Sequence, residues 1–372
     1  MVKVNFLFVL LLLSSLSAHA VKVDESIQTC AEGVLNACFE AGVHFQDQAK
    51  TLELDEKQDR NILFSKANEY FIKACDGGHG NACGKLAFNY EFANGIVKNI
   101  DKANSLYETA CSEGEMFACF NLGNNYRKGV GLSQSFEKAV KYYTLACDNN
   151  YYKACRALGF RYLNGEGVAK DAKKSVELFT LACDKDYFKS CYSLALRYKY
   201  GEGVSKDQKK ASKYFKLACN NENDRACTSL GFQYQRGKGV KKSPRKARGL
   251  FSEACDNDYF RACNILGELY KKGDNVKIDH GLAVSYFSKA CDNDYFRACE
   301  NLAFSYEYAE GVARSFEKAN ELYAKACEND LMKACYRLAI NYQSGSGLEK
   351  NTRKANELLS KACEADFKPA CN

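Results

Sequence analysis

The stretch Cys255-Asp-Asn-Asp-Tyr-Phe-Arg-Ala-Cys263 places two cysteines eight residues apart, and the same frame recurs along the chain. From Cys75 onward, each first cysteine follows the previous one by 36 residues. A fixed period of this size is typical of a solenoid, in which small helical units stack in a row. The frame includes all 20 cysteines: Cys30/Cys38, Cys75/Cys83, Cys111/Cys119, Cys147/Cys155, Cys183/Cys191, Cys219/Cys227, Cys255/Cys263, Cys291/Cys299, Cys327/Cys335 and Cys363/Cys371.

The spacing restricts how the cysteines of one frame are joined. On one continuous helix, residues eight apart are separated by about 12 Å, whereas a disulfide needs Cα atoms closer than about 7 Å. If the two cysteines bond to each other, the chain must therefore reverse between them. Because the flanking segments have helical patterns, each frame is then an elbow between two helices. Closing such a loop is worth about 2.5 kcal/mol in the chain-entropy model.

The N-terminus predicts export. Residues 1–20 combine Lys3 with an apolar stretch and end in Ala18-His19-Ala20, the pattern of a signal peptide cleavage site. We expect cleavage near Ala20 and a mature protein in the periplasm or outside the cell, where cysteines form disulfides. Zinc is the other interpretation of many cysteines, but zinc motifs have spacings shorter than this one. We expect no metal and no cofactor.

Composition limits the domain count and the partners. A net charge of +7 over 372 residues gives no reason to expect nucleic acid, and no later apolar run is long enough for membrane insertion. A chain of this length ordinarily forms two globular domains. The fixed period instead predicts one elongated array over residues 21–372, which we expect to be a monomer.

A helix, here called helix A, is predicted after each second cysteine. In the pattern Cys-x-x-Leu-Gly-x-x-Tyr from Cys155 to Tyr162, the recurring residues share one helix face. Loops such as Gly165-Glu-Gly167-Val168 follow, where glycine takes the left-handed conformation that ends a helix. A phosphate-binding loop is the alternative, but these loops follow a helix rather than a strand and recur in many copies.

A second helix, helix B, is predicted before each first cysteine. Ser243 followed by Pro244 has the pattern of an N-cap with proline in the first turn. A single A–B hairpin leaves its apolar stripe exposed, so neighbouring hairpins must cover it. We therefore predict an all-α solenoid of nine A–B hairpins between ten elbows. The buried stripe of one helix B is predicted to be Ala211, Tyr214, Phe215 and Ala218.

One irregularity lies in the first repeat. The distance from Cys38 to Cys75 is nine residues longer than the period, and the surplus falls around residues 46–60. This polar segment predicts a longer loop between helix A and helix B. The loop would either have no function of its own or form an additional edge of a binding site.

The combined pattern Ala-Cys-x-x-Leu-Gly-x-x-Tyr-x-x-Gly-x-Gly-Val, followed by Lys-Asp-x-x-Lys-Ala and Ala-Cys, resembles the Sel1-like repeat, a relative of the tetratricopeptide repeat. With two cysteines per repeat and a signal peptide, the chain is similar to the Helicobacter cysteine-rich protein family of epsilon-proteobacteria. The resemblance extends from Cys30 to Cys371, and the first repeat departs from it at Ala41 and Phe45. It implies a right-handed superhelix of helix pairs, secretion, and a slow β-lactamase activity with penicillin binding.

Two surfaces are candidates for binding. In arrays of this kind helix A lines the groove, so we expect its variable positions, two and six after the cysteine, to form a ridge that faces a peptide or a carboxylate. An ordinary solvated face is the alternative. The aromatic elbows Tyr187-Phe188, Tyr259-Phe260 and Tyr295-Phe296 are the second surface, unless these rings pack on their own repeat. The polar centre of the ridge is Asn121, Asn125, Arg161, Arg197 and Gln233.

The sequence contains letters of a serine β-lactamase motif but not its context. Ser135, Ser243 and Ser315 each stand three residues before a lysine, as in S-x-x-K. All three lie where a helix B begins, which predicts helix capping, and no S-D-N or K-T-G element accompanies them. The histidines after residue 20, His44, His79 and His280, are too far apart in sequence to suggest a zinc hydrolase.

The sequence thus favours a secreted scaffold that binds a protein or peptide partner, with a host component as one candidate. The alternative is a penicillin-binding protein with slow β-lactamase activity, for which a β-lactam would be the ligand and the catalytic residues are unknown.

Overall fold

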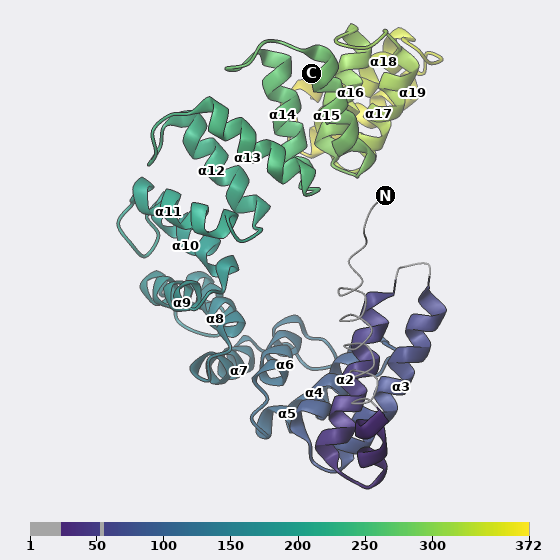
Figure 1. The fold of residues 1–372 in the computed structure, drawn as a ribbon. Helices are drawn as coiled ribbons and strands as arrows, with labels where there is room; N and C mark the ends of the chain where they lie inside the picture. Colours follow the sequence, from purple (N-terminus) through teal and green to yellow (C-terminus); the bar gives the residue numbers. More distant parts are fainter. Residues whose placement is uncertain (1–23, 53–55, 372) are drawn as a thin grey trace, which may run out of the picture. The chain divides into compact units, whose positions relative to one another are not determined.

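The computed structural model describes residues 24–52 and 56–371, so the predicted signal peptide lies outside the described part. The described chain is helical and divides into two compact units, one ending at Tyr187 and one beginning at Phe188 (Figure 1). No helix in these ranges is both long and apolar enough to cross a membrane.

The first unit contains four A–B pairs and the second contains five, counted over the described residues. In the first unit the A helices are α2 (Leu35–Thr51), α4 (Gly80–Phe92), α6 (Met116–Lys128) and α8 (Tyr152–Asn164), and the B helices are α3 (Lys57–Asp76), α5 (Ile100–Ser112), α7 (Phe136–Asp148) and α9 (Ala172–Asp184). In the second unit the A helices are α10 (Phe188–Tyr200), α12 (Asp224–Arg236), α14 (Phe260–Lys272), α16 (Phe296–Tyr308) and α18 (Met332–Ser344), and the B helices are α11 (Gln208–Cys219), α13 (Pro244–Asp256), α15 (His280–Asp292), α17 (Phe316–Glu328) and α19 (Thr352–Glu364), followed by the short helix η1 (Lys368–Ala370).

Local signals fix both ends of these helices. Helix α9 begins at an N-cap, Asp171, whose carboxylate accepts a hydrogen bond from the backbone N–H of Lys174. Helix α8 ends at Gly165, which is left-handed with φ of 74°, and Gly167 in the same loop has φ of 73°. The predicted left-handed glycine loops are therefore confirmed for the hairpins that begin with α4 and the later A helices, whereas α2 ends at Leu52 in an extended conformation.

Every described elbow for which geometry is resolved is closed by a disulfide across eight residues. The first cysteine lies at the end of one helix and the second at the start of the next helix A, except for Cys371, which follows η1; the Cα atoms of a pair lie 4.6–4.9 Å apart. Cys183 and Cys191 are disulfide-bonded as well, and none of the cysteines is free. Such complete oxidation is typical of proteins from an oxidising compartment. The resolved pairs are Cys30–Cys38, Cys75–Cys83, Cys111–Cys119, Cys147–Cys155, Cys219–Cys227, Cys255–Cys263, Cys291–Cys299, Cys327–Cys335 and Cys363–Cys371.

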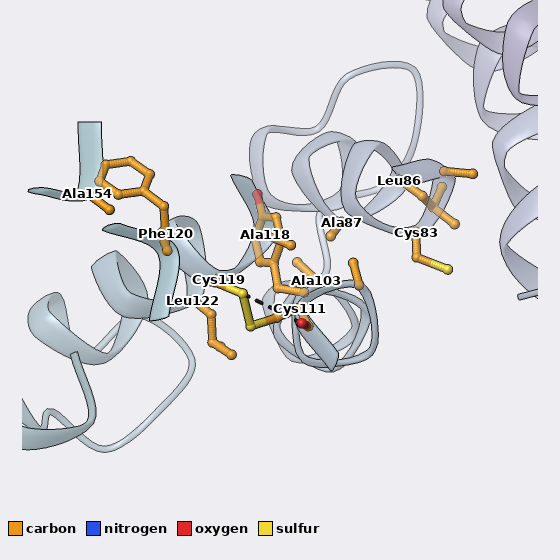
Figure 2. Packing of buried hydrophobic residues seen from close by; sticks show 14 of the residues in the cluster. Cys83, Leu86, Ala87, Ala103, Cys111, Ala118, Cys119, Phe120, Leu122 and Ala154 are labelled. Carbon is orange, nitrogen blue, oxygen red and sulfur yellow. Dashed lines mark hydrogen bonds between the residues drawn. A yellow bond between two sulfur atoms is a disulfide. The ribbon is translucent and has the colours of Figure 1, made fainter. Parts of the chain in front are cut away.

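In the B helices from α3 to α17, small residues near the elbow pack with one large buried ring. Figure 2 shows the Cys111–Cys119 disulfide between α5 and α6, with Ala103 and Leu122 packed around it. In the second unit, a Cβ atom added to Gly267 of α14 would lie 2.5 Å from the ring of Phe287 in α15. The small residue after the helix A leucine therefore admits an aromatic ring of the following helix B. Of the predicted stripe on α11, Ala211, Phe215 and Ala218 are buried and Tyr214 is half-buried.

The first repeat differs from the prediction. Helices α2 and α3 have 17 and 20 residues, whereas most helices in the described chain have 13. Helix α2 ends at Thr51 and α3 begins at Lys57, so the connection is shorter than the one from Lys128 to Phe136. The prediction of a longer loop is wrong, because the surplus residues extend the two helices instead.

In the second unit, a lysine of helix B ties consecutive elbows together. Lys325 Nζ donates to the carbonyl oxygen of Cys291, one period earlier, at 3.0 Å, and lies 3.0 Å from Oδ1 of Asp294. The carbonyl belongs to the last turn of the preceding helix B and also accepts from the backbone N–H of Asp294, so the lysine adds a second donor to it. The same arrangement joins Lys289 to Cys255 and Asp258, and Lys361 to Cys327 and Asp330.

Candidate binding surface on helix A

The residues six positions after the second cysteine, predicted to face a ligand, are used inside the fold. Asn125 in α6 is buried, and its Nδ2 donates to Oδ1 of Asn104 in α5 at 2.9 Å. Asn104 in turn donates to the carbonyl oxygen of Val130 in the next glycine loop, also at 2.9 Å. Asn125 is therefore not available to a ligand, because its side-chain amide joins helix A to the preceding helix B. Asn89 with Asn68 and Asn341 with Asn320 repeat this bond.

Gln233 is used in a similar way. Its side chain is buried in α12, and its Nε2 donates to Oε1 of Gln208 in α11 at 3.2 Å. Gln208 donates to the carbonyl oxygen of Lys199 at 2.9 Å. The amide of Gln233 is thus part of an internal chain of hydrogen bonds rather than a donor available to a partner.

The two arginines of the predicted ridge fold back onto their own loops. Arg161 Nη1 pairs with Glu166, and in the second unit Arg197 Nη1 pairs with Glu202 at 2.5 Å. Each arginine side chain is only 11% exposed, which leaves little of it for a partner. Both arginines stand 21 residues after a valine, Val140 or Val176, where the asparagine pairs have their first asparagine. The Arg–Glu ion pair therefore takes the place of the Asn–Asn hydrogen bond in the repeats whose helix B has no asparagine at this position.

Asn121 is the one member of the ridge whose side chain has no partner. It lies two positions after Cys119, is half-buried, and its Nδ2 finds no acceptor within the described part of the chain. Taken together, the five predicted residues do not form a continuous ligand-facing ridge.

The physical reason is the direction of successive side chains. Residues of an α-helix are about 100° apart, so position six lies on the flank that faces the preceding helix B. Positions one and five lie on the other side of the solvent face. Position five is half-buried or exposed in every repeat from α4 to α18, whereas position one is buried in some repeats, as at Phe120 and Asn264. The structure has clefts there in both units.

In the second unit, a cleft of about 690 Å³ crosses the A helices α14, α16 and α18. Its charged groups are largely paired, with Lys271 Nζ 2.8 Å from Glu310 and Lys333 Nζ 2.5 Å from Glu300. The ammonium of Lys271 also lies 3.8 Å from the centre of the Phe304 ring. The cleft thus combines apolar surface with charges of both signs. It is lined by Glu268, Lys271, Lys272, Arg297, Glu300, Asn301, Phe304, Asp330, Leu331, Met332, Lys333 and Phe367.

A weak signal of these positions is present in the sequence. The fifth residue after the second cysteine changes chemical type between repeats, from Phe160 to Glu268 to Phe304. Variation next to a fixed core stripe favours a binding position, but the same is true of any solvated face. Only the packing of neighbouring helices shows which flank of helix A is buried and which is open to a partner.

The aromatic elbows are partly covered. Both Tyr187 and Tyr295 are half-buried, and this partial burial raises the pKa of each hydroxyl. The rings are neither fully packed nor free to act as protruding anchors. All six, Tyr187, Phe188, Tyr259, Phe260, Tyr295 and Phe296, are half-buried.

The three serines of the S-x-x-K pattern are helix caps. Ser135 Oγ accepts from the backbone N–H of Lys138 at 3.2 Å, and Ser243 and Ser315 accept in the same way from Lys246 and Lys318. The ammonium of Lys138 lies 5.0 Å from the ring centre of Tyr126 in α6. Because serine oxygen and ammonium have separate partners, this pattern gives no nucleophile and base pair.

The capping role has a measurable cost. Replacing Ser243 by alanine is expected to lower the free energy of unfolding by about 1 kcal/mol, because the Lys246 N–H loses its acceptor. Replacement by glycine, which is tolerated at this position, is expected to cost only a few tenths of a kcal/mol. Urea unfolding followed by circular dichroism measures both values. Equal losses for the two variants would contradict the capping assignment.

The histidines are not brought together. His79 caps α4 and its ring stacks on Phe39 with ring centres 4.7 Å apart, whereas His280 is the first residue of α15. Within the ranges that the structure describes, no group of three or more potential metal ligands occurs.

Comparison with known proteins identifies the repeat. The Sel1 repeat model matches nine consecutive segments, residues 57–79, 80–115, 117–151, 153–187, 189–223, 224–259, 261–295, 297–331 and 333–367. The chain belongs to the Sel1 repeat family. A Sel1 repeat protein from Oxalobacter formigenes has a TM-score of 0.67 at 23% identity, with 81% of this chain and 88% of that chain covered. A comparison with curated proteins finds no match.

Two further Sel1 repeat relatives bear on the predicted family. A protective antigen of uropathogenic Escherichia coli with an SLR fold has a TM-score of 0.62 at 20% identity, over 94% of this chain and 80% of that one. Cysteine-rich protein B of Helicobacter pylori is 36% identical over 37% of this chain and 98% of its own length, with a TM-score of 0.31. The predicted resemblance to the Sel1-like repeat is confirmed, and Sel1 repeats typically serve as protein-interaction scaffolds.

Proposed function

We propose that this protein is an exported, disulfide-stapled scaffold that binds an extended segment of a partner protein along its A helices. The cleft across α14, α16 and α18 carries the proposal. It joins three consecutive repeats, so a segment lying in it would contact equivalent positions of each. Host components are one class of partner that an exported scaffold would meet.

The chemistry of the cleft suits a peptide better than a small molecule. Phe304, Leu331 and Met332 provide apolar surface, while the rim carries charges of both signs. A peptide offers alternating apolar side chains and polar backbone groups, which match such a surface. The ion pairs at the rim would exchange partners with charged residues of the segment rather than be buried unpaired.

A library of random peptides displayed on phage, selected on the immobilised oxidised protein, tests this function. For the peptides recovered, replacing Phe304 by alanine is expected to weaken binding about tenfold, because an aromatic side chain of the cleft would contribute as an interface anchor. Fluorescence anisotropy with labelled peptides measures the dissociation constants.

Leu217 supplies the matched control. It lies on helix B α11, is 37% exposed and belongs to the same unit, so Leu217→Ala removes a comparable apolar side chain outside the cleft. This variant is expected to bind within about twofold of the original protein. Loss of binding in Leu217→Ala with full binding in Phe304→Ala would place the partner on helix B and overturn the proposal. Circular dichroism shows whether each variant is folded.

A further inference from the structure

The first unit contains a second, smaller pocket whose charge differs from that of the cleft. It has a volume of about 230 Å³ and lies between α6, α7 and α8. Four of its lining side chains, Arg127, Lys153, Arg156 and Arg161, are cationic, and no aspartate or glutamate lines it, although Arg161 is paired with Glu166 of the neighbouring loop. Its lining is Phe120, Asn124, Arg127, Tyr143, Lys153, Arg156, Ala157, Phe160, Arg161 and Tyr187.

The aromatic rings of the pocket hold two of its cations in place. Lys153 Nζ lies 4.8 Å from the ring centre of Phe120, and the guanidinium carbon of Arg156 lies 4.9 Å from that of Phe160. A cation stacked on a ring keeps its direction and loses less side-chain freedom when an anion arrives. The positive charge of this pocket is therefore preorganised.

The tyrosine hydroxyl at the pocket wall already donates a hydrogen bond within the protein. Tyr143 in α7 donates to Oδ1 of Asn124 at 2.8 Å. Burial raises the pKa of Tyr143, and the nearby charges of Arg127 and Arg161 act in the opposite direction. The tyrosine consequently stays neutral at physiological pH and does not offset the positive charge of Arg127, whereas Arg161 is already paired with Glu166.

The corresponding cleft of the second unit shows that this charge is not a property of the repeat. There, Glu268, Glu300 and Asp330 stand among the cations, and Glu300 is paired with Lys333. In the first unit the equivalent positions, one and five after the second cysteine, hold Arg156 with Phe160 and Phe120 with Asn124. Cations in a partly buried pocket attract a carboxylate more strongly than cations in open water.

We infer that this pocket receives an acidic side chain of the partner segment, with an adjacent apolar side chain lying on Phe120 and Phe160. This inference rests on the proposed function and specifies which sequences the scaffold selects. The volume of the pocket fits one or two side chains rather than a folded surface. Aspartate and glutamate are thus the residues expected at this point of the segment.

The test compares two peptide selections from one random library, on the original protein and on the double variant Arg127→Gln, Lys153→Gln. The original protein is expected to enrich peptides with an aspartate or glutamate next to an apolar residue. The double variant is expected to lose this enrichment and to bind the acidic peptides about tenfold more weakly or worse. Exchanging the acidic residue of a peptide for its amide should produce a similar loss on the original protein only.

Lys141→Gln serves as a control, because Lys141 is exposed on α7 and does not line the pocket, yet its replacement removes one of the two positive charges that the double variant loses. Inorganic phosphate, added as a competitor, separates a site for a peptide from a general anion site. Acidic peptides that bind the double variant unchanged, binders without acidic enrichment, or displacement by phosphate at concentrations comparable to the peptide would each overturn the inference and leave the cleft intact. A folded protein that recovers no peptide at all would overturn the proposed function itself.

Discussion

Replacing Cys111 and Cys119 together by alanine is expected to lower the free energy of unfolding by about 2.5 to 4 kcal/mol. The disulfide joins the end of α5 to the start of α6, so its loss frees a short loop in the unfolded chain. Both sulfurs are also in the core, where Cys119 is fully buried, and their removal leaves a small void. Urea unfolding of the folded, oxidised variant by circular dichroism measures this loss.

The last disulfide is the matched control. Cys371 is exposed, and the bridge from Cys363 fastens only the short helix η1 to the end of α19. Because few buried residues depend on it, the pair Cys363→Ala, Cys371→Ala is expected to cost clearly less. Local unfolding of a terminal repeat changes the stability of an array less than a break in its interior. Equal losses in the free energy of unfolding for the two double variants would contradict this expectation, because the effect of a disulfide would then not depend on the packing around it.

Gly167→Ala is expected to be strongly destabilising, at roughly 3 kcal/mol. A Cβ atom at Gly167 would lie 2.3 Å from the carbonyl carbon and oxygen of Phe136, the first residue of α7. Backbone atoms of a helix start cannot move aside as a flexible side chain can. The left-handed conformation adds a smaller penalty of about 1 kcal/mol. Thermal and urea unfolding of the variant measure the loss.

Gly165→Ala, in the same loop, separates the two contributions. Its Cβ atom would come closest to Cβ of Lys170, at 3.2 Å, with backbone atoms of Lys170 no nearer than 3.5 Å, and the conformation is equally left-handed. Two repeats already carry alanine at the equivalent place, Ala93 with φ of 59° and Ala309 with φ of 60°. This exchange is therefore expected to cost about 1 kcal/mol. A loss as large as that of Gly167→Ala would mean that conformation, and not contact with α7, governs both positions.

The sequence predicted the repeat architecture because each of its signals is local. The 36-residue period, the elbows and the glycine loops depend on residues close together in the chain, and so does the cap at Ser243. The extension of α2 and α3 was missed because the polar residues of 46–60 suit an exposed helix as well as a loop.

The binding surface was less predictable because both flanks of helix A are polar. Asn125 and Asn121 look alike in sequence, yet one bonds inside the fold and the other has no partner for its amide nitrogen. The spacing of 21 residues between Asn104 and Asn125, repeated at Asn68 with Asn89 and at Asn320 with Asn341, was a detectable sign of internal pairing. The choice between flanks requires knowing against which side the next hairpin packs.

The lysine bonds between consecutive elbows bear on how such a chain changes its length over generations. Lys325 carries the donor for the elbow one period before it, and its own elbow at Cys327 offers the same acceptor to Lys361. A whole repeat inserted in register would have a carbonyl for its lysine and a lysine for its carbonyl. Deleting a whole repeat would likewise leave no lysine and no carbonyl without its partner. Duplication or loss of a whole repeat thus preserves these hydrogen bonds, whereas an insertion of another length breaks them and destabilises the array.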